Sequence, residues 1–272
     1  MKKISVILLA LAIVAIPSCK NQNNKKQAEE AATHEITEKE KLVAEELKVN
    51  LQNLIESTKQ MKAVPFIYSE NGAVQLTAKE KMVKPDYLLA PSAANDLVTL
   101  AQKYRAVAML SIDKVIAKMY DMPVDEIEAA LAKLTLEIND PALKEFSDNL
   151  QANKGAGDAI SKFLQDEYDA NRANFYWEAM AAGLVEQIYI LTRNMDKFLP
   201  MFDDQAASDV TYNFVCVHEG ISSMVEFYPE MESLNSALLP LYVINAINVN
   251  QLRDQLTELK GEIEVVRTIL LK

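Results

Sequence analysis

The stretch at residues 175–191, FYWEAMAAGLVEQIYIL, carries only three strongly polar side chains, those of Glu178, Glu186 and Gln187. A helix that is apolar on most of its faces is normally surrounded by other helices. The stretch is shorter than the roughly 20 apolar residues of a membrane-spanning helix, and it contains two carboxylates. We therefore expect this stretch to be the central helix of an all-α domain.

The composition of the whole chain agrees with that expectation. The 272 residues include only 6 glycines and 9 prolines, and half of the chain is apolar, which favours helix and permits a large core. The charge is acidic, with 28 basic against 39 acidic residues. This balance argues against a nucleic-acid partner, because binding to a phosphate backbone needs clustered Lys and Arg.

The N-terminus has the organisation of a targeting segment. Lys2 and Lys3 precede residues 4–16, which are apolar except for Ser5. A basic start followed by a short apolar run is typical of a signal peptide, and the run is too short for a spanning helix.

The end of this segment, Ile16-Pro17-Ser18-Cys19, resembles the lipobox of bacterial lipoproteins. The resemblance implies that residues 1–18 are a lipoprotein signal peptide and that Cys19 becomes the acylated first residue of the mature chain. A multiply acylated cysteine would hold the protein on a membrane, because each buried methylene contributes about 0.8 kcal/mol. An ordinary secretory signal with a coincidental cysteine is the alternative.

The rest of the chain divides into a tether and one domain. Residues 19–33 are rich in Asn, Gln and Lys, lack apolar periodicity and are expected to be a disordered tether. Residues 34–272 are expected to form a single bundle of about eight helices, over residues 34–62, 92–120, 123–138, 141–152, 158–202, 205–228, 230–248 and 250–271.

The last of these helices has apolar residues at alternating steps of four and three. This heptad seam predicts a helix that closes the bundle rather than one that forms a dimer. Its members are Leu252, Leu256, Leu259, Ile263, Val266 and Leu270.

No motif for catalysis or for metal binding stands out. Cys216 and His218 are two residues apart, so on a helix they point away from each other and cannot bind one ion. The apolar neighbours of Cys216 indicate an inert thiol. We expect no metal, no cofactor and no catalytic residues.

Polar residues inside apolar helices are the remaining candidates for function. Asp113, Glu178 and Glu186 must be paired or protonated if they are buried. One interpretation is a structural network of ion pairs or hydrogen bonds that joins helices. The other is a small polar pocket between helices, with Glu186 and Arg193 as its charged groups. The candidate ligand-binding residues of that pocket are Tyr176, Trp177, Glu186, Tyr189 and Arg193.

A second resemblance concerns the central helix. Tyr104 and Asp113 on one helix, followed by Ala182-Gly183-Leu184-Val185-Glu186-Gln187-Ile188-Tyr189 on another, look like uncharacterised all-helical lipoproteins of the Bacteroidetes type. The resemblance implies an all-α fold and an envelope location, and it brings no activity. The residues after Cys19 are neutral and basic rather than acidic, which by the same resemblance favours an outer-membrane lipoprotein that faces the periplasm.

These observations predict a lipid-anchored protein of the cell envelope with a non-catalytic interaction or scaffold role. Its expected partners are the membrane, through the N-terminal lipid, and an envelope protein or a small ligand. The alternative is a carrier or sensor domain that binds a small ligand between helices near Glu186 and Arg193.

Overall fold

The computed structural model describes residues 38–67, 75–151 and 156–272. It divides within helix α1 (Glu38–Thr58) into two units, Met1–Leu51 and Gln52–Lys272. The described part of the first unit is helical. The expected signal peptide, lipidation site and tether lie outside the described residues, and the contacts below are those of the second unit.

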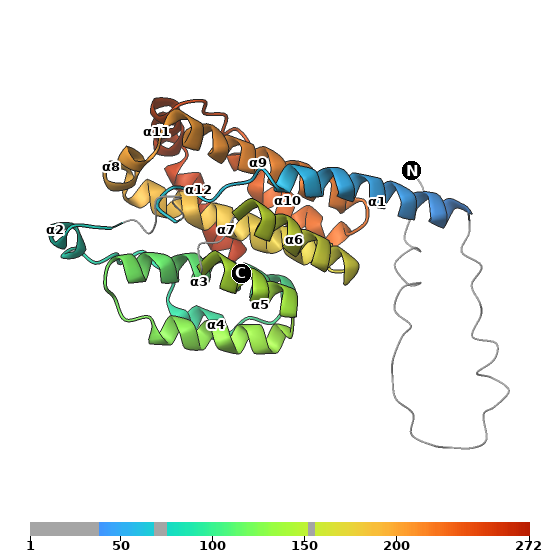
Figure 1. Cartoon of the computed structure of the whole chain (residues 1–272), viewed down its shortest axis with the longest axis horizontal. Coiled ribbons are helices and arrows are strands. Elements are labelled where there is room, and N and C mark those ends of the chain that lie inside the picture. Colours follow the sequence, from blue (N-terminus) through green and yellow to red (C-terminus); the bar gives the residue numbers. More distant parts are fainter. Residues whose placement is uncertain (1–37, 68–74, 152–155) are drawn as a thin grey trace, which may run out of the picture. The chain divides into compact units, whose positions relative to one another are not determined.

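The described residues contain α-helices and short 3-10 helices and no strand, which confirms the all-α prediction (Figure 1). The described residues form twelve α-helices, somewhat more than the eight or so predicted, because several predicted helices are divided. After α1 they are α2 (Ala78–Lys81), α3 (Leu100–Met119), α4 (Asp125–Ile138), α5 (Pro141–Gln151), α6 (Ala156–Asp169), α7 (Ala173–Arg193), α8 (Met195–Phe198), α9 (Asp204–Val225), α10 (Glu232–Leu238), α11 (Val249–Glu258) and α12 (Lys260–Leu270). The 3-10 helices are η2 (Pro91–Asn95), η3 (Leu199–Met201), η4 (Pro229–Met231) and η5 (Leu239–Leu241).

The central predicted helix, residues 158–202, is three α-helices because two asparagines interrupt it. Asn171 adopts the left-handed conformation with φ 56°, which Asn tolerates better than most residues, and it separates α6 from α7. Asn194 leaves helical geometry with φ −143°, and α7 ends there.

The C-terminal region departs from the prediction in a similar way. Pro240 lies in η5, and the chain after η5 is not helical until α11. The last predicted helix breaks at Leu259, so it forms α11 and α12. Five members of the seam are nonetheless buried, namely Leu252, Leu256, Ile263, Val266 and Leu270. The seam packs α11 and α12 onto α7 and α9, as expected for a helix that closes the bundle.

Helix α7 is the centre of the second unit. It is buried on nearly every face and contacts α3, α6, α9 and α12 (Figure 1). Its contact with α9 is very close at one point, where a Cβ built on Gly220 would lie 2.2 Å from Trp177 Cη2. Only a residue without a side chain lets α9 approach the indole this closely.

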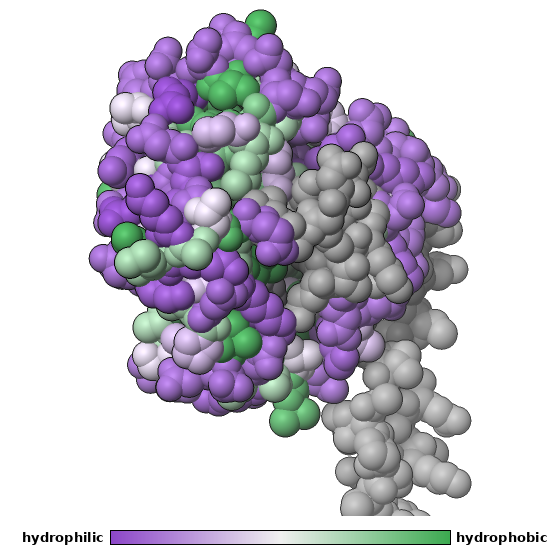
Figure 2. All heavy atoms as spheres, turned by 60° about the vertical axis from the view of Figure 1, so that its left-hand side comes forward, coloured by the Kyte–Doolittle hydropathy of each residue, from purple (hydrophilic) through white to green (hydrophobic). Residues whose placement is uncertain are grey.

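The face of the molecule shown in Figure 2 is mostly hydrophilic, with small hydrophobic groups and one narrow hydrophobic strip. Scattered apolar residues are normal on a protein surface. The core therefore lies inside, around α7.

Candidate ligand-binding pocket

The five predicted ligand-binding residues lie in two separate places along α7. Tyr176 and Trp177 are fully buried near its beginning, with ring centroids 4.7 Å apart in an edge-to-face arrangement. Glu186, Tyr189 and Arg193 lie further along the helix, about 15 to 25 Å from Tyr176 at a rise of 1.5 Å per residue. The structure therefore does not bring the five side chains together.

Glu186 is paired with Arg267 of α12 rather than with Arg193. Arg267 Nε donates to Glu186 Oε2 at 2.6 Å, and its Nη2 donates to Glu186 Oε1 at 2.8 Å. The same guanidinium lies 4.1 Å from the centroid of the Tyr189 ring. Arg193 is exposed instead, with its guanidinium carbon 6.0 Å from the centroid of the Tyr87 ring. The sequence placed Arg193 near Glu186 because both lie on one helix, whereas the packing of α12 on α7 makes Arg267 the actual partner of Glu186.

Asp113 of α3 extends this ion pair into a three-helix cluster. Its Oδ2 accepts a hydrogen bond from Leu89 N at 2.7 Å. Burial, together with the neighbouring Glu186 carboxylate, raises the pKa of Asp113 well above its usual value. The raised pKa favours the neutral form of Asp113, and Arg267 is the cation that pairs with Glu186.

A second buried carboxyl cluster lies where α5, α6 and α7 meet α3. Tyr104 donates to Asp140 Oδ2 at 2.6 Å, and Arg172 Nη2 donates to Asp140 Oδ1 at 2.7 Å. Burial and a hydrogen bond with Asp140 raise the pKa of Glu167 to about 9. Burial alone would raise the pKa of Asp140, but hydrogen bonds from Glu167 and Tyr104 outweigh it and lower the pKa. The two carboxyls thus share one proton at neutral pH.

Sequence reasoning did not identify this second cluster. Asp140 was visible only as the residue before Pro141, at the start of a helix, where its Oδ1 accepts a hydrogen bond from Ala142 N at 3.0 Å. Glu167 and Arg172 flank the interruption after α6, and neither stands in a motif.

Glu178 forms the third buried carboxylate contact. Arg105 Nε lies 3.4 Å from Glu178 Oε2, and burial raises the pKa of Glu178. The carboxylates at Asp113, Glu178 and Glu186 are therefore paired or protonated, as their burial requires.

The described residues give no support for a reactive cysteine or for a histidine metal site. Burial raises the pKa of Cys216 to about 12, and His218 is exposed. Within the described ranges, no group of three His, Cys, Asp or Glu side chains is placed to hold a metal ion.

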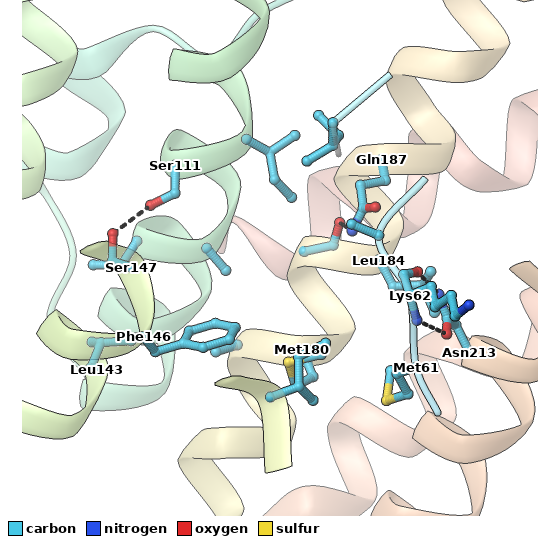
Figure 3. Close-up of a pocket in the computed structure, with 18 residues that line it drawn as sticks. Met61, Lys62, Ser111, Leu143, Phe146, Ser147, Met180, Leu184, Gln187 and Asn213 are labelled. Carbon is cyan, nitrogen blue, oxygen red and sulfur yellow. Dashed lines mark hydrogen bonds between the residues drawn. The ribbon is translucent and has the colours of Figure 1, made fainter. Parts of the chain in front are cut away.

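The pocket of the second unit lies elsewhere, on the side of α7 that faces α3 and α5 (Figure 3). It has a volume of about 70 Å³ and opens to solvent. Its walls are mainly apolar side chains and small residues, contributed by α3, α5, α6, α7 and α9 and by residues 61–67. The central ones are Met61, Val107, Ala108, Ile112, Leu143, Phe146, Met180, Gly183 and Leu184.

Two amide side chains build one wall of this pocket by holding the non-helical segment after α1. Gln187 Oε1 accepts a hydrogen bond from Val64 N at 3.1 Å. Asn213 Oδ1 accepts from Lys62 N at 3.3 Å, and Asn213 Nδ2 donates to Lys62 O at 2.7 Å. These bonds satisfy the N–H and C=O groups of Lys62 and the N–H group of Val64, which no helix pairs.

Gly183 enlarges the pocket because it has no side chain. A Cβ at this position would lie 3.5 Å from Ile112 Cδ1 and 3.8 Å from Ala108 Cβ, which are ordinary contacts. A side chain could therefore occupy this space, and glycine leaves it open. None of the five predicted ligand-binding residues lines the pocket.

Comparisons with protein-family profiles, with curated proteins and with solved structures find no match to this chain. Across the described helices, none is both long enough and apolar enough to cross a membrane.

Proposed function

We propose that this chain is a lipid-anchored, non-catalytic binding protein of the bacterial cell envelope that holds a small apolar ligand in the pocket between α3, α5 and α7. The single observation that carries this proposal is the pocket itself. It is a concave, mainly apolar site with few polar groups, which is typical of small-molecule sites. A ligand that covers this apolar surface removes it from water and is stabilised by doing so.

The anchoring part of the proposal is supported by the N-terminal sequence. The lipobox-like residues ending at Cys19 favour acylation, and the residues that follow favour the periplasmic face of the outer membrane. Such an anchor would leave the helical unit free to exchange ligand beside the bilayer.

The ligand site proposed here differs from the one expected near Glu186 and Arg193. Glu186 already has two hydrogen bonds from Arg267, and Asp140 accepts hydrogen bonds from Tyr104 and Arg172. The pocket instead presents apolar surface that the described residues leave uncovered, so it is the better place for a ligand.

Mass spectrometry of small molecules that co-purify with the chain tests this proposal. The chain is isolated from native membranes as wild type, as Gly183→Ala and as the matched control Gly261→Ala, whose added methyl meets nothing within 4 Å. We expect an apolar molecule with the wild type and the control, in reduced amount with Gly183→Ala. Equal recovery from all three, or no bound molecule, would contradict the proposal.

An interaction role is a second candidate, favoured by three exposed apolar side chains in the segment after α10. Leu239, Val243 and Ile247 follow one another at four-residue intervals and are 56%, 61% and 67% exposed. We expect Val243→Asp to reduce recovery of a partner by cross-linking in intact cells. Val98→Asp, at an exposed position in the loop before α3, serves as control. The same cross-linked products from both variants would remove this candidate.

A further inference from the structure

The size of the pocket limits the shape of its ligand. Its volume of about 70 Å³ is less than half of the roughly 150 Å³ that holds a benzene ring in a protein core. The space inside is therefore small for a six-membered ring. A chain one methylene wide does fit, and because the pocket opens to solvent the rest of such a molecule can extend outside.

The polar groups of the pocket walls limit the chemistry of the part that enters. The amide of Asn213 and the amide oxygen of Gln187 are already bonded to the segment that they hold. Gln187 Nε2 donates to Gly183 O of its own helix. Ser111 and Ser147 face each other from α3 and α5 with their Oγ atoms 3.4 Å apart (Figure 3). A polar group placed inside would lose its water and compete for groups that already have partners, which is unfavourable.

The side chains of the walls suit a flexible hydrocarbon. Met61 and Met180 line the pocket, and an unbranched thioether side chain adapts its shape to what it contacts. Because Gly183 has no side chain, space for about one methyl group remains between α7 and α3, next to Ala108. A chain with many rotamers can follow such an irregular space, whereas a rigid ring system cannot.

The charge at the pocket indicates the kind of head group. Lys62 is the one charged residue among those that line it, and it is exposed. Its ammonium group makes no ion pair with any residue of the described segments. Lys62 is therefore the one lining residue whose side chain can attract an anionic group held outside the pocket.

We infer that the pocket binds the end of an unbranched alkyl chain that carries an anionic head group, with Lys62 beside the head. This inference rests on the proposed function and names its ligand class. The same chemistry is present in a free fatty acid and in an acyl chain of an anionic phospholipid.

Calorimetric titration with alkanoates of increasing length tests the inference. The full-length chain carries Cys19→Ala, so that no attached acyl chain competes for the pocket, and each alkanoate is used below its micelle concentration. Burying one more methylene should tighten the dissociation constant roughly fourfold. We expect this increment for several members of the series, followed by a plateau when the pocket is full.

Two variants locate the binding in the pocket. Gly183→Ala should weaken the longer alkanoates roughly fourfold, the value of about one methylene, and Gly261→Ala should not. Lys62→Gln should weaken decanoate up to roughly fivefold and leave decanol unchanged, because an exposed ion pair contributes little. The side-chain change leaves the Lys62 backbone bonds to Asn213 in place.

The controls separate this inference from the proposed function. If benzene or indole binds in a manner sensitive to Gly183→Ala and the alkanoates do not, the alkyl-chain inference is overturned and an apolar ligand site remains. If neither class binds, both proposals fail. Short-chain dihexanoyl phosphatidylglycerol is titrated alongside hexanoate; binding of either supports the inference, and the tighter of the two identifies the source.

Discussion

At the scale of single residues, three glycines in helices have different surroundings and therefore different predicted substitutions. A Cβ at Gly220 would meet three atoms of the Trp177 ring at 2.2–2.5 Å, whereas one at Gly261 would meet nothing within 4 Å. Alanine stabilises a helix relative to glycine by up to about 1 kcal/mol. Steric overlap with a fully buried indole costs roughly 1–3 kcal/mol or more.

We predict that Gly220→Ala lowers the free energy of unfolding by about 1–3 kcal/mol, whereas Gly261→Ala raises it by up to about 1 kcal/mol. Gly183→Ala should also be stabilising, because its methyl would make ordinary contacts in the pocket. Denaturant unfolding monitored by circular dichroism measures all three. If Gly220→Ala had the same free energy of unfolding as the wild type, α9 and Trp177 would not approach each other as described.

Glu167 gives a second residue-scale prediction, on pH. Its pKa is raised to about 9 from an ordinary value of 4.5, so the folded state binds more protons than the unfolded state between these values. Stability from this group is fully present below about pH 4.5 and is lost as the pH rises through 9. The free energy of unfolding that is lost in this way is on the order of a few kcal/mol.

Glu167→Gln should remove this pH dependence, because an amide resembles the neutral acid and does not ionise. We expect the variant to match the wild type near pH 5 and to be the more stable of the two near pH 9. Thermal unfolding at both pH values checks this. A difference between the two proteins that stays constant with pH would contradict the raised pKa.

The sequence predicted part of this residue-scale picture. That Asp113, Glu178 and Glu186 would be paired or protonated followed from their apolar surroundings alone. The partner Arg267 could not be predicted, because it is 81 residues from Glu186 and only the packing of α12 on α7 brings it there. Gln187 and Asn213 carry the same signal, a polar side chain on an apolar helix, but their backbone partners lie on a segment without periodicity.

At the scale of elements, the prediction of a central helix at residues 175–191 is confirmed by α7. This helix could be predicted because the residues that are buried on all of its faces form one continuous apolar stretch in the sequence. The helix ends were harder to predict, since Asn171 and Leu259 interrupt helices through backbone geometry that apolar spacing does not report. The pocket was not predictable, because its walls come from segments far apart in the chain.

The junction of α7 and α12 gives a prediction at this scale. Arg267 is the cation that balances Glu186, whose side chain is fully buried. Arg267→Met should destabilise the protein by about 3–5 kcal/mol, because it leaves a buried carboxylate beside Asp113 without a positive partner. The exposed Arg193→Met is the matched control and should change stability by less than about 0.5 kcal/mol. Equal effects of the two variants in denaturant unfolding would contradict the pairing.

At the scale of the whole molecule, the proposed anchor at Cys19 predicts where the protein is found. Cys19→Ala should move it from the membrane to the soluble fraction, because acyl chains supply the binding energy that holds a domain on a bilayer. Fractionation with immunoblotting measures this, with metabolic labelling by a fatty acid as a second readout. A variant that stays on the membrane would show that the lipid is not its only attachment.

The account as a whole depends on a ligand site in the pocket beside α7, and methyl NMR of the methionines tests it most directly. Met61 and Met180 line the pocket, whereas Met224 and Met231 are fully buried and do not line it. On addition of octanoate we predict that the methyl resonances of Met61 and Met180 shift in a saturable way while those of Met224 and Met231 stay in place. Unchanged resonances of Met61 and Met180 at high octanoate, or equal shifts at all four methionines, would contradict the account.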